Sequence, residues 1–218
     1  MKVALISATK ASLDPIERAF HEEAPDIELI HLLDTELLSM MEKEGALTPN
    51  IILRFSSLLN IAVSSEIDAI QLTCSAFNNI TSILQPLYKV KLFRSDEAML
   101  DQALAYERIG LISTVRETPI ALTSYLQEKK ANVQVESIVD SGLIHLLYQG
   151  EKDKHDERVK EMIYQMEGKV DVIVLSQYSM EHIADQVTCS TPILTAPRAA
   201  AKRCYTYLQN QYSTNKSS

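Results

Sequence analysis

An internal repeat is the feature that most restricts how this chain can fold. The second half repeats landmarks of the first half in the same order. The matched pairs are KVALISAT (2–9) with RIGLISTV (108–115), Asp14-Pro15 with Thr118-Pro119, and HLLDTELL (31–38) with SIVDSGLI (137–144). The first and third pairs are typical of buried strands, and the second is typical of an N-cap with proline in the first helical position. The repeat predicts two similar α/β lobes.

The most informative part of the repeat is DAIQLTCSAFNN (68–79). Its apolar run ends in small polar residues before a helix predicted to start at Asn78, which indicates the carboxyl end of a buried parallel strand. DVIVLSQYS (171–179) repeats the pattern, so that Cys74 matches Gln177. One lobe therefore offers a thiol where the other offers an amide.

Apolar stripes on the preceding helices support the same alignment. The stripe residues are Phe55, Leu58, Leu59 and Ala62 in the first half, and Val159, Met162, Ile163 and Met166 in the second. We expect two doubly wound parallel-sheet lobes, related by a pseudo-two-fold axis, with the active-site cleft between them. The first lobe comprises residues 1–95 and 197–218, and the second comprises residues 96–196. The last helix, from Arg198, is expected to pack on the first lobe, and the polar tail from Ser213 to fray.

Composition excludes several classes of function. A net charge of -8 argues against a nucleic-acid-coating surface and against binding to an anionic membrane. The five glycines form no nucleotide-binding loop, and the five histidines form no zinc motif, so we expect no cofactor and no metal. The first residues are typical of a strand, because their apolar run is too short for a signal peptide. Three widely spaced cysteines favour reduced thiols and a cytoplasmic protein.

Small polar residues gather where the strands are predicted to end. Parallel strands place their carboxyl ends at one edge, and hydroxyls with helix N–H groups suit a small carboxylate there. The predicted catalytic residue is Cys74, and the predicted substrate-binding residues are Ser7, Thr9, Thr73, Ser75, Ala76, Thr114, Gln177, Tyr178 and Ser179. A simpler interpretation makes Cys74 a small buried hydrophobe and the hydroxyls strand caps. Cys189 and Cys204 are interpreted as structural, and His182 as a helix-surface histidine.

Several stretches resemble the aspartate/glutamate/hydantoin racemase superfamily. They are LISAT near the start, QLTCSAFNN, FRSDEAM (93–99), RIGLISTVRETP, VIVLSQYSM and PILTAP (192–197). The resemblance implies two α/β lobes, dimers or higher oligomers, and cofactor-independent chemistry at a carbon beside a carboxylate or carbonyl. Its racemases use two thiols on opposite faces of the substrate. Cys74 matches the first thiol, and Gln177 stands where the second belongs.

The sequence leaves more than one function open. The first hypothesis is a racemase-type enzyme that moves a proton on a small amino acid, hydantoin or dicarboxylate, with Cys74 as its single thiol. An amide can hold an enolate oxygen but has no usable proton equilibrium, so a second proton donor would be Tyr178, Ser179, His182 or water. The alternatives are a cofactor-free decarboxylase of the same superfamily and a non-catalytic small-carboxylate binding protein. A thiol redox role is a weaker option.

Overall fold

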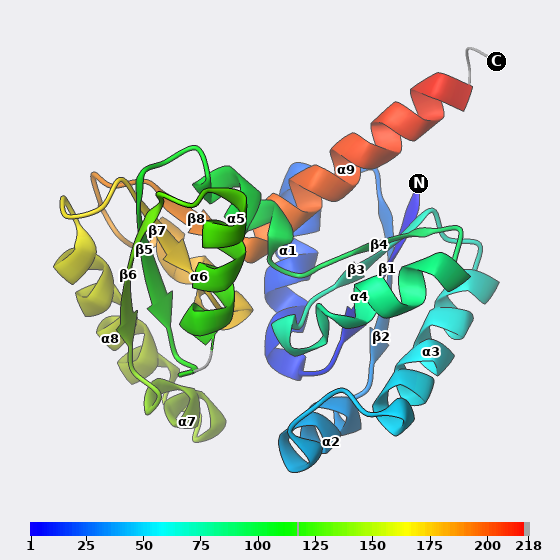
Figure 1. Ribbon diagram of the computed structural model, residues 1–218, viewed down its shortest axis with the longest axis horizontal. Coiled ribbons are helices and arrows are strands. Elements are labelled where there is room, and N and C mark those ends of the chain that lie inside the picture. Colours follow the sequence, from blue (N-terminus) through cyan, green and yellow to red (C-terminus); the bar gives the residue numbers. More distant parts are fainter. Residues whose placement is uncertain (117, 216–218) are drawn as a thin grey trace. The chain divides into compact units, whose positions relative to one another are not determined.

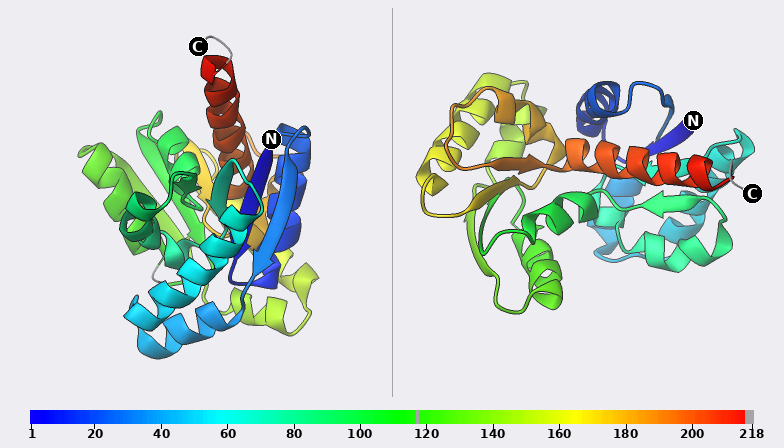
Figure 2. Two further views of the ribbon diagram at one scale, coloured as in Figure 1. Left: turned by 90° about the vertical axis from the view of Figure 1, so that its right-hand side faces the viewer. Right: turned by 90° about the horizontal axis from the view of Figure 1, so that it is seen from above.

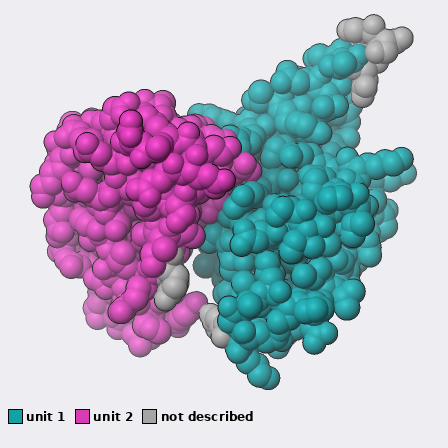
Figure 3. All heavy atoms as spheres, in the orientation of Figure 1, with its two compact units in different colours: residues 1–95, 200–218 teal, residues 96–199 magenta. Residues whose placement is uncertain are grey.

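The structure is a computed structural model that describes residues 1–116 and 118–215. The chain forms two compact units, coloured separately in Figure 3: unit 1 is Met1–Ser95 with Ala200–Ser218, and unit 2 is Asp96–Ala199. Each unit contains one four-stranded parallel sheet, so the expected α/β class with two similar sheets is confirmed. The pseudo-two-fold axis and the cleft between the lobes stay predictions.

Unit 1 places its strands in the order β2-β1-β3-β4. The strands are β1 (Lys2–Ser7), β2 (Glu28–Leu33), β3 (Ala69–Leu72) and β4 (Lys91–Phe93). The helices are α1 (Leu13–Glu23), α2 (Glu36–Glu44), α3 (Pro49–Ser64) and α4 (Ile80–Leu84), with short 3-10 segments η1 (Lys10–Ser12), η2 (Ser75–Phe77) and η3 (Gln85–Leu87). Figure 1 shows these helices flanking the sheet.

Unit 2 repeats this topology, with its strands in the order β6-β5-β7-β8. The strands are β5 (Arg108–Ser113), β6 (Gln134–Val139), β7 (Val172–Leu175) and β8 (Ile193–Thr195). The helical segments are α5 (Glu97–Ala103), α6 (Thr118–Lys129), α7 (Leu143–Tyr148), α8 (Lys152–Met166) and the 3-10 segment η4 (Tyr178–Asp185). The last helix, α9 (Ala196–Asn215), begins in unit 2 and continues in unit 1.

The repeat holds at the level of single hydrogen bonds. Before β3, Asp68 accepts a bond from the Lys2 backbone N–H at 2.7 Å, and before β7, Asp171 accepts one from the Arg108 N–H at 2.9 Å. After these strands, the Thr73 N–H donates to the Ile6 carbonyl at 3.1 Å, and the Ser176 N–H donates to the Ile112 carbonyl at 3.0 Å. Cys74 and Gln177 each follow the last of these matched residues. The alignment of thiol with amide is therefore a structural correspondence.

Each sheet packs against apolar helix faces. In unit 1, Phe55, Leu59 and Ala62 of α3 are buried in a cluster with β1 and β3 residues. In unit 2, the matching stripe of α8 is buried against β5 and β7; its residues are Val159, Met162, Ile163 and Met166. Gly110 of β5 lets α8 approach closely, because an added Cβ would overlap the Met166 sulfur. The two predicted helix stripes therefore form the cores that hold the strand ends in place.

Some boundaries differ from the expectations. Asp14 and Pro15 are not the cap and first residue of α1, since the helix begins at Leu13 after η1. Proline is tolerated there because N–H groups of a helix's first turn have no partner within the helix. The last helix begins at Ala196 rather than Arg198, and it is helical through Asn215 where fraying from Ser213 was expected. Residues 216–218 lie outside the described part.

Most of the last helix, α9, packs within unit 1. The Tyr207 ring meets Phe93 of β4 edge-on, with centroids 5.3 Å apart. Farther along, the Tyr212 hydroxyl donates to Asp68 at 2.9 Å, and Lys202 pairs with Glu23 of α1 at 3.3 Å. Figure 2 shows α9 running along unit 1. Unit 1 is thus built from the two ends of the chain.

Candidate functional site

Cys74 lies at the carboxyl end of β3. Its backbone is extended (φ -131°, ψ 121°), its side chain is partly exposed, and it is the N-cap residue of η2. The helix expected to start at Asn78 is shorter than predicted: three residues of 3-10 structure precede α4, which begins at Ile80. So few aligned peptide units give a weak dipole. A helix N-terminus can stabilise a thiolate, and the short helical segments after Cys74 offer little of this effect.

A chain of hydroxyl groups lies beside the thiol in unit 1. The Ser7 and Thr73 oxygens are 2.8 Å apart, the Thr73 and Ser12 oxygens are 2.9 Å apart, and Ser12 donates to the Thr9 carbonyl at 2.9 Å. Each hydroxyl has one proton, and Ser12 uses its own on Thr9, so Ser12 accepts from Thr73, whose oxygen also lies 3.4 Å from the Ile6 carbonyl, and Thr73 accepts from Ser7. All three hydroxyl-bearing side chains are buried. The chain ties η1 to the end of β3 and fixes the backbone next to Cys74.

The other predicted residues of unit 1 lie along the same two strand ends. Thr9 caps η1, since its hydroxyl accepts from the Ala11 N–H at 3.3 Å. Ser75 is exposed and Ala76 is partly exposed, both in η2 directly after the thiol. The structure therefore brings Ser7, Thr9, Thr73 and Cys74 together, with Ser7 and Thr73 used for internal bonds.

Gln177 occupies the matching end of β7, and its amide is fully hydrogen-bonded within unit 2. Its Oε1 accepts from the Thr114 N–H at 2.9 Å and from the Thr114 hydroxyl at 3.4 Å. Its Nε2 donates to the Ser113 oxygen at 3.0 Å and to the Thr118 oxygen at 3.4 Å. A carboxamide has two donor hydrogens and two acceptor sites, so all four are used. Gln177 therefore joins the end of β5 to the start of α6.

The two strand ends use equivalent residues differently. In unit 1, the Thr73 hydroxyl is bonded on both sides. In unit 2, Ser113 donates to the Val115 carbonyl at 2.7 Å, and the Ser176 hydroxyl, which matches Thr73, has no partner among the described residues. Of the remaining predicted residues, Thr114 and Tyr178 are buried and Ser179 is partly exposed. The prediction that these two groups of residues face each other stays a prediction.

The three cysteines differ in how readily they can form a thiolate. Burial raises the pKa of Cys204, on α9, to about 12. Burial, and then the nearby Glu167 carboxylate, raise the pKa of Cys189. Both thiols are therefore held in the protonated form at neutral pH, as their structural interpretation expects. Cys74 differs from both because it combines partial exposure with a position at the carboxyl end of a strand.

Sequence reasoning missed several residues that shape the two strand ends. Ser12 completes the hydroxyl network by bonding to Thr73, which is 61 residues away in the sequence. Thr118 completes the amide network by bonding to Gln177, which is 59 residues away. His155 and Asp156 of α8 were also missed, although they form a buried polar group with His182 of η4. The sequence could have indicated that His155 is buried. It lies one helical turn before Val159, on the same face as the apolar stripe of α8.

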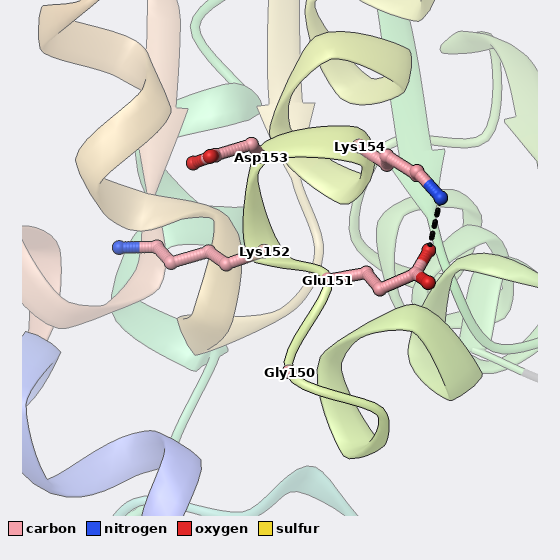
Figure 4. Close-up of a pocket in the computed structure, with 5 residues that line it drawn as sticks. All are labelled: Gly150, Glu151, Lys152, Asp153 and Lys154. Carbon is pink, nitrogen blue, oxygen red and sulfur yellow. Dashed lines mark ion pairs between the residues drawn. The ribbon is translucent and has the colours of Figure 1, made fainter.

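One further pocket lies on a stretch of chain that carries none of the predicted site residues. A pocket of about 240 Å³ lies at Gly150–Lys154, where Figure 4 shows Glu151 paired with Lys154 at 2.7 Å. One continuous surface stretch lines it, and it includes none of the predicted site residues. Within residues 1–116 and 118–215, no group of three or more His, Cys, Asp or Glu side chains is placed to hold a metal ion. Across the same residues, none of the helices has the length and apolar character needed to span a bilayer.

Comparison with solved structures gives clear matches along almost the whole chain. Glutamate racemase from Francisella tularensis, solved with D-glutamate, has a TM-score of 0.70 at 14% identity and covers 97% of this chain and 82% of its own. An aspartate racemase homologue from Pyrococcus horikoshii has a TM-score of 0.73 at 14% identity, with 95% and 98% covered. Allantoin racemase from Klebsiella pneumoniae has a TM-score of 0.69 at 17% identity, with 97% and 89% covered.

No protein-family model and no curated protein matches the sequence. The identities of 14–17% are low, whereas the matching structures cover both sheets and the helices between them. The chain therefore has the fold of the glutamate, aspartate and allantoin racemase structures, the fold that its sequence resemblance to the aspartate/glutamate/hydantoin racemase superfamily implies.

Proposed function

We propose that this protein is a cofactor-independent enzyme of the racemase type, which moves a proton at the carbon next to a carboxylate or carbonyl of a small substrate. The observation that carries the proposal is the position of Cys74, a partly exposed thiol at the carboxyl end of a central strand in this fold. In open α/β sheets that edge is where ligands bind. Cys74 is the proposed acid/base, because a thiol can give up and return a proton near neutral pH.

The bonds of Gln177 favour chemistry on one face over two-thiol racemisation. All four hydrogen-bonding sites of its amide are used by Ser113, Thr114 and Thr118. It therefore neither replaces the second thiol nor has a spare bond for an enolate oxygen in this arrangement. Proton exchange, isomerisation or decarboxylation with protonation from the Cys74 side fits this arrangement best. Ser75 and the backbone of η2 are the proposed substrate contacts in unit 1, with Ser179 as the candidate in unit 2.

The test is solvent-deuterium incorporation at the carbon next to the carboxylate or carbonyl. A panel of amino acids, hydantoins and malonates is incubated in D2O with wild-type protein, and exchange or loss of CO2 is followed by NMR. Removing an acid/base group costs about 10²–10⁴ in rate, so Cys74→Ala should abolish most turnover. Cys189→Ala removes another partly exposed thiol and is the matched control, with turnover expected to stay unchanged. Turnover that survives Cys74→Ala contradicts the proposal.

A small-carboxylate binding protein is the second candidate, and the closed amide network of Gln177 favours it. Calorimetric titration with the same panel separates the two. A ligand that binds wild type and Cys74→Ala equally, without exchange or turnover, supports binding alone. A ligand that binds and undergoes Cys74-dependent exchange supports the enzyme.

We also propose that the protein works as a homo-oligomer in the cytoplasm. The sequence resemblance to the racemase superfamily supports the oligomer, and the widely spaced cysteines support a reducing compartment. Light scattering of the purified protein tests the first statement, with a monomer at micromolar concentration as the contradicting result.

A further inference from the structure

Unit 2 contains a buried polar cluster that the proposed chemistry does not use. Asp156, near the start of α8, bridges two imidazoles: His155 Nδ1 lies 2.8 Å from its Oδ1, and His182 Nε2 of η4 lies 2.7 Å from its Oδ2. His155 is fully buried, Asp156 is 7% exposed, and the His182 side chain is 12% exposed. His182 is therefore not the helix-surface histidine that the sequence suggested.

The protons of this cluster can be assigned from its partners. An ionised carboxylate only accepts hydrogen bonds, so both imidazoles donate to Asp156. His155 Nε2 is buried and has no partner among the described residues. A second N–H there would be a buried unsatisfied donor, so the neutral Nδ1–H tautomer fits this site. His182 is then the group that connects η4 to the carboxylate on α8.

The 3-10 conformation of η4 depends on contacts with the rest of unit 2, because it is weakly stabilised by its own hydrogen bonds. η4 is eight residues long, whereas 3-10 runs of more than three or four residues are uncommon because their hydrogen bonds are poorly aligned. Met180 and Ile183 of η4 are buried against α8 residues, and Arg198 at the start of α9 pairs with Glu181 and Asp185. Asp156 supplies the polar contact between η4 and the helix on which it packs.

We propose that Asp156 is a positioning residue for the end of β7 in unit 2, where Gln177 and Ser179 lie. By binding His182, it holds η4 in the 3-10 conformation, and η4 begins at Tyr178 and Ser179, directly after Gln177 at the end of β7. The inference rests on the proposed function for its catalytic consequence. The conformational consequence stands independently of it.

Hydrogen–deuterium exchange measured by mass spectrometry tests the conformational part. The two imidazoles contact different oxygens of Asp156, and an asparagine replaces one of these oxygens with an NH2 group that cannot accept from an imidazole N–H, so Asp156→Asn should raise amide exchange in residues 178–186 roughly tenfold. Asp171→Asn is the matched control, since it breaks the Arg108 ion pair at the opposite edge of the same sheet. Unchanged exchange of this segment in folded Asp156→Asn overturns the proposal.

A second pair of variants guards against a protein that fails to fold. His182→Leu removes the donor from η4 and leaves α8 intact, and it should raise exchange in the same segment. His182→Gln keeps an N–H donor at a similar reach and should restore the wild-type pattern. Equal exchange in the Leu and Gln variants contradicts a role for the bond to Asp156, whereas a difference between them supports it.

Measurements of kcat/KM test the catalytic part of the proposal, and they do so at temperatures where loss of overall stability has no effect. If wild type shows Cys74-dependent exchange, Asp156→Asn and His182→Leu should lower kcat/KM about tenfold to a hundredfold at temperatures where both are folded, because small displacements of positioning groups are costly. Asp171→Asn should stay within a factor of three. If wild type shows no turnover, the proposed function fails, and the exchange measurements alone still decide whether Asp156 holds η4.

Discussion

At the scale of single residues, the two strand ends differ in what their polar groups are bonded to. In unit 1, the hydroxyls of Ser7, Thr73 and Ser12 satisfy one another beside a thiol. In unit 2, the carboxamide of Gln177 occupies the matching position and bonds to Ser113, Thr114 and Thr118. Equivalent backbone positions therefore carry a thiol, Cys74, in unit 1 and a fully hydrogen-bonded amide, Gln177, in unit 2.

Gln177→Ala is expected to destabilise unit 2. The substitution leaves the buried Thr114 N–H without its acceptor, and a lost partner of this kind costs about 1–3 kcal/mol. Urea denaturation followed by circular dichroism measures the loss. Gln149→Ala, at the C-cap of α7, is the control and should change the free energy of unfolding little. Equal stability of the wild type and Gln177→Ala would show that the amide bonds are replaced by water at no cost.

Asp34 is expected to make stability depend on acid pH. The Arg54 guanidinium donates two hydrogen bonds to this carboxylate and lowers its pKa. An acid whose pKa falls on folding stabilises the folded state above its unfolded pKa of about 4, and the effect is lost as pH falls through the folded-state pKa. Asp34→Asn should therefore lower Tm at pH 7, and its difference from wild type should shrink below about pH 4.

Thermal melts across this pH range check the sign of the Asp34 effect. Glu28→Gln removes a more exposed carboxylate that pairs with Lys2 at 3.3 Å, and it is the control. Exposed pairs of this kind contribute little, so its melting curve should follow that of the wild type. A difference between Asp34→Asn and wild type that grows toward acid pH contradicts the prediction.

At the scale of elements, strands and buried helix faces could be predicted, whereas the 3-10 segments could not. The apolar runs at residues 69–72 and 172–175 and the stripe from Val159 to Met166 set β3, β7 and α8 directly. Between Cys74 and Pro86, weak helix formers such as Ser75, Asn78 and Asn79 interrupt the predicted helix, and the segment forms η2, α4 and η3 instead. His182 was misassigned because η4 repeats every three residues rather than every 3.6.

The candidate site was predictable in position but not in bonding. The repeat alone placed Cys74 and Gln177 at equivalent strand ends. The partners of Gln177 are 59 to 64 residues away, and Asp156 reaches His182 across 26 residues, so local pattern carries no signal for these bonds. They follow from the packing of α6 and α8 on the sheet.

Close packing of α8 on β5 gives a prediction at this scale. A methyl group added at Gly110 would overlap the Met166 sulfur and approach Val170, so Gly110→Ala should destabilise unit 2 by about 1–3 kcal/mol. The cost should be smaller in a Met166→Ala background, because the smaller side chain leaves room for the methyl. A double-mutant cycle in urea measures the coupling. Additive effects of the two substitutions would contradict the close approach.

At the scale of the whole molecule, the two units differ in how the chain builds them. Unit 2 is one continuous segment, whereas unit 1 takes its last helix from the far end of the sequence. Leu208 of α9 is 2% exposed, and Tyr207 and Tyr212 bond or pack against β4 and Asp68. Contacts made by residues after position 200 therefore stabilise strands formed by the first hundred.

Leu208→Ala is expected to weaken unit 1 rather than unit 2. Truncating a buried leucine costs about 2–5 kcal/mol. Hydrogen exchange should rise in β1, β3 and β4, with β5 and β7 close to wild type. Leu147→Ala, in α7 of unit 2, is the reciprocal control and should leave the exchange of unit 1 unchanged. Greater exchange in β5 and β7 than in β1 and β3 for Leu208→Ala would contradict the assignment of α9 to unit 1.

Unit 1 is built from two segments that are far apart in the sequence, and this has a consequence for biosynthesis. A ribosome releases the strands of unit 1 before unit 2, yet unit 1 stays incomplete until residues 200–215 are translated. Unit 2, although it is encoded later, is the first unit to have all its residues translated. A chain cut near position 199 would thus keep all of unit 2 and lose the part of α9 that packs in unit 1, so Cys74 reaches its finished surroundings only after residues 200–215 are made.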